Sequence, residues 1–312
     1  AVALKRCSSR FKDLATPLLA NAVSRINTKW RDAADKIGEE GAARIRGGLE
    51  RNEVLTELDL TAAALAAALA ILDGGGGIGG EGAKALASAL RVNGVLKSLN
   101  LRGNAIRDEG AAAIADALKG NEVLINLNLD DNQLCGIDLL GEGTYSAAGI
   151  TALAEALKVN GVLTKLDLAL NAIGDDGAEA LASALRVNGV LTDLNLCYNQ
   201  IRDEGAAAIA EALRGNEVLT SLDVSFNTLT EEAALGIVRV ERQRNKLTSL
   251  SLAGCSIGST GAAEIAEYVS GSEVLTELDL SRNCIDNTGA EALASALRVN
   301  EVLKRIHLGE ND

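Results

Sequence analysis

A single histidine, His307, is available for general acid–base chemistry in this sequence. Serine and cysteine nucleophiles are usually activated by a neighbouring imidazole, so one histidine is a poor basis for a catalytic centre. Acidic residues are abundant, but they recur at regular intervals and form no isolated pair for acid and base catalysis. We therefore predict that the protein is not an enzyme, and we interpret His307 as a surface residue.

Cysteines and a glycine-rich stretch are the other residues with potential chemistry. No two of the five cysteines have the Cys-x-x-Cys spacing of a zinc or redox site. We expect reduced thiols and an intracellular, cytoplasmic location, and the basic N-terminal segment leaves an organelle open. The letters Gly77-x-Gly79-x-x-Gly82 match a dinucleotide-binding motif, but residues 78–82 align with residues 173–177, an ordinary turn of the repeat described below. We predict neither a metal nor a cofactor.

One pattern, Leu-x-x-Leu-x-Leu-x-x-Asn, recurs along the chain. Copies start at residues 163, 191, 219, 247, 275 and 303, a constant step of 28, and earlier copies start near residues 55, 96 and 124. The apolar–polar alternation in each copy is typical of a strand, and the alanine-rich run that follows has the period of a helix. A strand and a helix repeated at a fixed step predict a solenoid whose units pack on their neighbours.

The stacking distances of strands and helices predict the shape of this α/β solenoid. Parallel strands lie about 4.8 Å apart and packed helices about 8–10 Å apart. We therefore expect a right-handed, curved horseshoe with parallel strands on the concave face and helices on the convex face. The asparagine of each copy should bond the backbone of its own turn and the next, forming a ladder. Pairs such as Asn188-Gly189 are expected to end the helices in a left-handed conformation.

These residues resemble the leucine-rich repeat (LRR) family, and within it the ribonuclease-inhibitor-like subclass. The resemblance covers residues 27–312, and the same subclass occurs in the LRR arrays of NOD-like receptors and in Ran GTPase-activating protein. It rests on the 28-residue step, the Asn or Cys at the end of the pattern and the helical second half of each unit. The nine copies of the pattern and a degenerate unit before them give an array of about ten repeats.

The breaks in the repeat predict the domain organisation. Residues 1–26 are expected to form an N-terminal helical cap, and residues 27–312 the array, with a degenerate first unit over 27–54. Insertions at about 62–77 and 135–146 lengthen two steps after the strand and before the helix, so both should emerge on one rim. They are either binding loops or tolerated surface loops.

Charge and hydropathy limit the class of partner. Residues 1–31 carry a net charge of +6 and the rest of the chain −19, which together make the total of −13. The strong negative charge after residue 31 predicts that the partner is a protein with a basic surface and not a nucleic acid. Alternatively, this charge only keeps the array soluble. No apolar run approaches 18 residues, so no membrane span is expected. Because no capping helix follows the last strand, we expect a C-terminal end that is truncated or covered by a partner.

Two columns of the repeat contain candidate protein-binding residues. Large apolar side chains stand in three adjacent units two positions after the third leucine of the pattern, and aromatic anchors are typical of binding hot spots. Acids and amides form a stripe between the second and third leucine. With a tyrosine of the second insertion, the candidates are Leu170, Tyr198, Phe226, Asp167, Asn195, Asp223 and Tyr145. Alternatively, the stripe is structural and the apolar residues only pad the corner after the strand.

Three functions are therefore open. The first is a protein-interaction scaffold that binds a partner through the concave face and the insertion rim. The second is a GTPase-activating protein resembling the Ran type. The third is a structural subunit of a large assembly.

Overall fold

The computed structural model describes residues 39–61, 77–137 and 141–311 of the chain. In these residues nine parallel strands form one sheet, and their order in the sheet is their order in the chain. Each strand has three residues. The strands are β1 (Glu57–Asp59), β2 (Ser98–Asn100), β3 (Asn126–Asn128), β4 (Lys165–Asp167), β5 (Asp193–Asn195), β6 (Ser221–Asp223), β7 (Ser249–Ser251), β8 (Glu277–Asp279) and β9 (Arg305–His307).

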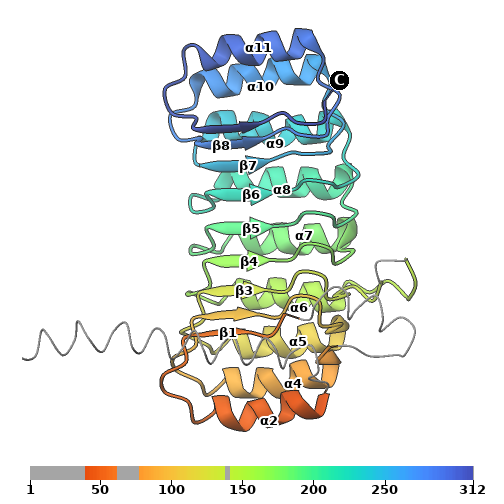
Figure 1. Cartoon of the computed structure of the whole chain (residues 1–312), viewed down its shortest axis with the longest axis vertical. Helices are drawn as coiled ribbons and strands as arrows, with labels where there is room; N and C mark the ends of the chain where they lie inside the picture. Colours follow the sequence, from red (N-terminus) through yellow and green to blue (C-terminus); the bar gives the residue numbers. More distant parts are fainter. Residues whose placement is uncertain (1–38, 62–76, 138–140, 312) are drawn as a thin grey trace, which may run out of the picture.

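A helix precedes each of these strands, and the helices cover one face of the sheet (Figure 1). They are α2 (Glu39–Leu49), α4 (Gly79–Leu90), α5 (Arg107–Leu118), α6 (Ala148–Leu157), α7 (Gly174–Leu185), α8 (Asp203–Gly215), α9 (Glu231–Arg244), α10 (Ser259–Gly271) and α11 (Asn287–Leu297). The helices spread over a longer stretch of the molecule than the strands do, so the array curves with the strands inside. The predicted α/β solenoid is confirmed.

The middle residue of each strand holds the sheet in exact register. Leu58 lies beside Leu99, and the same pairing continues, leucine on leucine, through β8 to Ile306 in β9. These leucines are buried, and alanines on the inner face of the helices pack against the same core. Small helix residues let neighbouring helices approach closely: a Cβ added at Gly82 of α4 would lie 2.9 Å from Cβ of Ala42 in α2.

The asparagine at the end of the pattern forms a ladder as expected, but its side chain bonds its own turn and the preceding one, and not the next. The N–H of Asn171 donates to Oδ1 of Asn199 (3.0 Å), and the N–H of Asn199 donates to Oδ1 of Asn227 (3.0 Å). The Asn171 amide also donates to the carbonyls of Leu129, Leu168 and Ala169. Each buried amide therefore joins two turns, which satisfies polar groups that would otherwise be costly inside the core.

A second asparagine column lies where the helices end, and here the expectation for the Asn–Gly pairs is wrong. Gly189 does not adopt a left-handed conformation, and α7 ends with Arg186 still in helical conformation. The Asn188 side chain instead donates to the carbonyl of Leu157 in the preceding unit (2.6 Å). Its Oδ1 accepts from the N–H groups of Val190 (3.0 Å) and Leu191 (2.7 Å). The amide stops the helix by bonding across units, so glycine's conformational freedom is not needed.

The domain boundaries remain predictions. The expected cap (1–26), the first part of the degenerate unit 27–54 and nearly all of the first insertion (62–77) lie outside the described residues. The described parts of the second insertion (135–146) lie between β3 and α6, where Ile137 and Gly143 form an antiparallel bridge. Among the helices that the structure describes, none is long and apolar enough to cross a membrane.

Candidate protein-binding site

The residues with potential chemistry are dispersed in the fold. His307 is half-exposed in β9, with Nε2 3.8 Å from Oε1 of Glu277. Cys135, Cys197 and Cys255 are free thiols, and burial raises the pKa of each to about 12, so they stay protonated and unreactive at neutral pH. Within residues 39–61, 77–137 and 141–311, no group of three His, Cys, Asp or Glu side chains is placed to hold a metal ion.

The loop after each of the strands β2 to β9 contains a residue with a left-handed backbone at one fixed position, two residues after the third apolar residue of the pattern. We call this column the first loop row. It consists of Gly103, Asp131, Leu170, Tyr198, Phe226, Gly254, Arg282 and Glu310. Leu170, Tyr198 and Phe226 have φ values of 56°, 54° and 52°. Glycine is the residue that adopts this conformation without strain, so large side chains here carry a local cost of about 1–2 kcal/mol each.

The two aromatic rings of the first loop row are stacked. The Tyr198 and Phe226 centroids lie 4.5 Å apart and the ring planes differ by 7°. On the side of the next unit, a Cβ added at Gly254 would lie 2.7 Å from Cδ1 of Phe226, so the ring covers this glycine. The Arg282 guanidinium lies 5.8 Å from the centre of the Phe226 ring and pairs with Glu310 (2.9 Å). The row is a continuous stack across several units.

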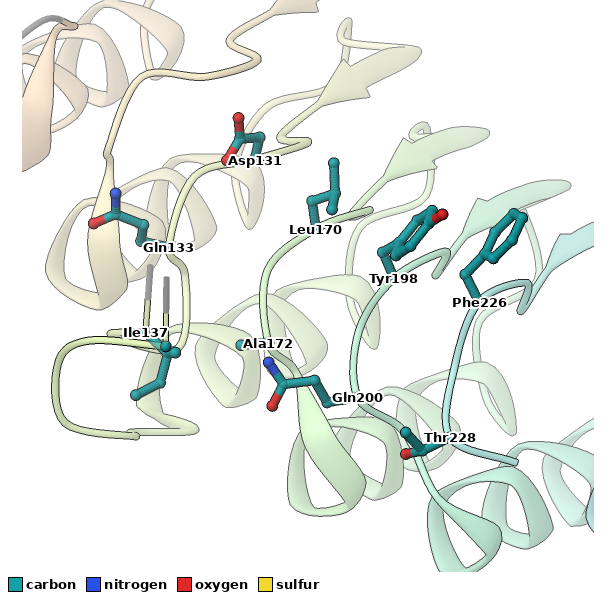
Figure 2. Close-up of a pocket in the computed structure, with 10 residues that line it drawn as sticks. Asp131, Gln133, Ile137, Leu170, Ala172, Tyr198, Gln200, Phe226 and Thr228 are labelled. Carbon is teal, nitrogen blue, oxygen red and sulfur yellow. The ribbon is translucent and has the colours of Figure 1, made fainter. Parts of the chain in front are cut away.

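An open pocket of about 350 Å³ lies beside this stack (Figure 2). The side chains of Leu170, Tyr198 and Phe226 lie in one line along its edge. Opposite them is a second loop row, two residues further along each loop, which contributes Gln133, Ala172, Gln200 and Thr228. Asp131 and, from the second insertion, Ile137 and Gly141 complete the lining. The structure therefore brings the apolar candidates and part of the second insertion into one pocket.

The polar candidates of the strands have a role that most of the described units share. In Asp167, Asn195 and Asp223, Oδ1 accepts the N–H of the residue two positions on, at 2.8–3.1 Å. This bond turns the chain out of the strand, and Asn100, Asn128 and Asp279 make it as well. Asp167 and Asn195 also line a second hollow of about 380 Å³ over β2 to β5, which Asp223 does not reach. The structural alternative for the stripe is therefore supported, and a contact role remains a prediction.

Tyr145 lies away from the pocket that the other apolar candidates share. Its hydroxyl donates to the carbonyl of Ile173 (2.7 Å), and its ring lies against Gly174 at the start of α7. Its side chain is 41% exposed. Tyr145 holds the second insertion against the following unit, and the described residues Ile137 and Gly141 of that insertion lie at the end of the loop rows.

Sequence reasoning missed the acidic end of the site. Asp130 is buried beside the pocket residue Asp131; one of its oxygens pairs with Nε of Arg102 (3.0 Å), and Oδ1 has no partner in the described part of the chain. Burial raises the pKa of Asp130 to about 6, with Arg102 opposing the shift and Asp167 and Asp131 adding to it. Asp131 could have been found from the sequence, because it occupies the column of Leu170.

Comparisons with known proteins find a repeat family in this chain and partial similarity to solved structures. The family model described as Leucine Rich repeat matches residues 92–115, 159–182, 187–210, 215–238, 244–266 and 271–294. A solved structure of leiomodin-1 actin-binding site 2 is 21% identical, with a TM-score of 0.35 over 59% of this chain and 87% of that chain. The C-terminal domain of a Caenorhabditis elegans tropomodulin is 15% identical, with a TM-score of 0.41 over 49% of this chain and 92% of that one. No curated protein sequence matches significantly.

Proposed function

Because this chain contains leucine-rich repeats between residues 92 and 294, we propose that it is a non-catalytic protein-binding module whose partner occupies the pocket beside the first loop row. The observation that carries the proposal is the meeting of two features in one place. Leu170, Tyr198 and Phe226 line the same pocket as Ile137 and Gly141 of the second insertion. Regular units alone would not create this composition, since both features depart from the repeat.

The left-handed backbone is a regular feature of this column. Gly103 and Gly254 avoid its cost, whereas Asp131, Arg282 and Glu310 carry it as Leu170, Tyr198 and Phe226 do. What distinguishes the three adjacent units is therefore the large apolar side chain that each places at the edge of the pocket. The stacked rings of Tyr198, which is 46% exposed, and Phe226, which is partly buried, provide a large and rigid contact area, which is typical of interaction hot spots.

Affinity capture with a matched control tests the proposal. Wild-type protein, the variant Tyr198→Gly/Phe226→Gly and the control Val159→Gly/Val187→Gly are used as baits, and the captured proteins are quantified by mass spectrometry. Val159 and Val187 are 66% and 64% exposed, and glycine occupies their column at Gly120 and Gly215. Both variants therefore replace two apolar residues by a residue that the repeat already uses there.

We expect wild type and control to capture the same partner and the pocket variant to lose it. Equal capture by all three baits would show that the pocket is not the binding site. The ribonuclease-inhibitor-like assignment is part of this proposal, supported by the helix in each unit and the Asn or Cys ladder. The GTPase-activating and structural-subunit hypotheses remain predictions, since no contact at the pocket favours either of them.

A further inference from the structure

The charges along the first loop row are ordered. Asp131 lies at one end, next to Leu170, and Arg282 with its partner Glu310 lies at the other, beyond Phe226. The apolar part of the row, Leu170 to Phe226, separates the two. A ligand lying along this row therefore meets a carboxylate at one end, apolar side chains in the middle and the Arg282–Glu310 ion pair at the far end.

The Asp131 carboxylate is available to a ligand. It lines the pocket and is partly exposed, and among the residues that the structure describes it has no ion pair within 4.0 Å. The nearby Arg102 is paired with the neighbouring Asp130, through Nε and Oδ2 at 3.0 Å. Arg102 is thus already bound to another carboxylate, and a cation from outside would find Asp131 unpaired.

The opposite wall of the pocket offers hydrogen bonds without net charge. Gln133 and Gln200 line it with side-chain amides, each of which can both donate and accept. Thr228 is less available, because its hydroxyl donates to the carbonyl of Ile201 (3.0 Å). Neutral amides spaced along a groove suit the alternating N–H and C=O groups of an extended peptide, whose main chain needs both kinds of partner.

We infer that the pocket binds an extended peptide segment of a partner protein, with an arginine or lysine of that segment at Asp131 and an apolar or aromatic side chain on the Leu170–Tyr198–Phe226 edge. The inference rests on the proposed function and adds the chemistry of the ligand and the place of its basic residue. The carboxylate attracts the basic residue, and its methylene stem lies against Leu170. At the Phe226 end the charge of Arg282 is balanced by Glu310, so Asp131 is the group of this row that places the basic residue, at the Leu170 end.

Selection from a display library of random 12-residue peptides tests the inference. The full chain is the bait, and the dissociation constants of selected peptides are measured by fluorescence anisotropy against three variants. Asp131→Asn removes the charge and keeps a residue that tolerates the left-handed backbone. Glu179→Gln makes the same charge change at an exposed site on helix α7. Tyr198→Gly/Phe226→Gly removes the aromatic edge. Circular dichroism confirms that each variant is folded.

We expect selected peptides to contain a basic residue, to bind about tenfold more weakly to Asp131→Asn and to bind Glu179→Gln unchanged. Peptides without a basic residue, or equal affinity for Asp131→Asn and wild type, would overturn the inference. If such peptides still fail to bind Tyr198→Gly/Phe226→Gly, the proposed function stands without it. If the library yields no binding peptide, the inference is also overturned. The affinity-capture experiment then tests the proposed function separately. A wild-type dimer abolished by Tyr198→Gly/Phe226→Gly would assign the pocket to a second copy of the chain instead.

Discussion

Glu241 and Arg244 form a buried ion pair (2.6 Å), and the two side chains together replace one asparagine of the repeat. Arg244 stands one unit after Asn216, which donates to carbonyls of the preceding units and accepts the N–H groups of Val218 and Leu219. Arg244 takes over the donor role, bonding the carbonyls of Asn216 and Leu219. Glu241 takes over the acceptor role, accepting the N–H groups of Lys246 and Leu247. One amide function is thus divided between two charged side chains.

Breaking this pair should destabilise the array strongly. Leucine occupies the column of Glu241 in two earlier units, at Leu185 and Leu213, so Glu241→Leu introduces a residue that fits there. The variant leaves the Arg244 guanidinium buried without its partner. We expect a loss of about 3–5 kcal/mol, because an unpaired buried charge is costly. The double variant Glu241→Leu/Arg244→Asn restores the pattern of the other units and should recover most of this loss. Denaturant unfolding of both variants measures the difference, and equal stability of single and double variants would contradict the division of roles.

Removing the Tyr198 ring should cost little stability when glycine replaces it. Stacking on Phe226 contributes about 0.5–1.5 kcal/mol, and relief of the left-handed strain at φ 54° returns a similar amount. Alanine removes the ring and keeps the strain, so Tyr198→Ala should be less stable than Tyr198→Gly by about 1 kcal/mol. Melting temperatures of the two variants provide the comparison. A more stable alanine variant would mean that the strain is relieved in another way.

Adding one methyl group at Gly254 should disturb the pocket from outside. Its Cβ would lie 2.7 Å from the Phe226 ring, at a position whose φ of +62° already disfavours alanine. We expect Gly254→Ala to lower stability by at least about 1 kcal/mol, to displace Phe226 from Tyr198 and to weaken partner capture. Gly189→Ala is the control, since nothing lies within 4 Å of its added Cβ. The near-ultraviolet circular dichroism of the stacked rings reports the displacement, and an unchanged spectrum would contradict it.

Asp130 should make stability depend on pH between about 4 and 6. Its folded pKa of about 6 lies above the ordinary value of 3.8, so the folded protein holds the proton more tightly than the unfolded chain. The stabilising contribution of the protonated group is complete below pH 3.8 and is lost as the pH rises through 6. The melting temperature of wild type relative to Asp130→Asn should therefore fall from pH 4 to pH 6 and stay constant above. A difference that does not change with pH would place the Asp130 pKa near its ordinary value.

The sequence by itself determined the strands, the helices, their order and the asparagine ladder. Each of these depends on contacts between adjacent units 28 residues apart, so a periodic pattern contains the information that places them. The same pattern also identified the column of Leu170, Tyr198 and Phe226. The pattern was misleading at the helix ends. The pair Asn188-Gly189 is typical of a left-handed helix end, but the Asn188 amide instead bonds a carbonyl of the unit before it.

Only the tertiary structure decided which departures from the repeat act together. The second insertion has no periodic partner, so its position beside the first loop row follows from the Tyr145 hydroxyl bond to Ile173 and the packing around Gly174. The replacement of an asparagine by Glu241 and Arg244 could not be predicted from the sequence, because charged residues on a helix normally indicate a solvated face. In a solenoid the repeat specifies neighbour contacts; the contacts of residues that break the repeat depend on folded geometry, and the candidate site is built from such residues.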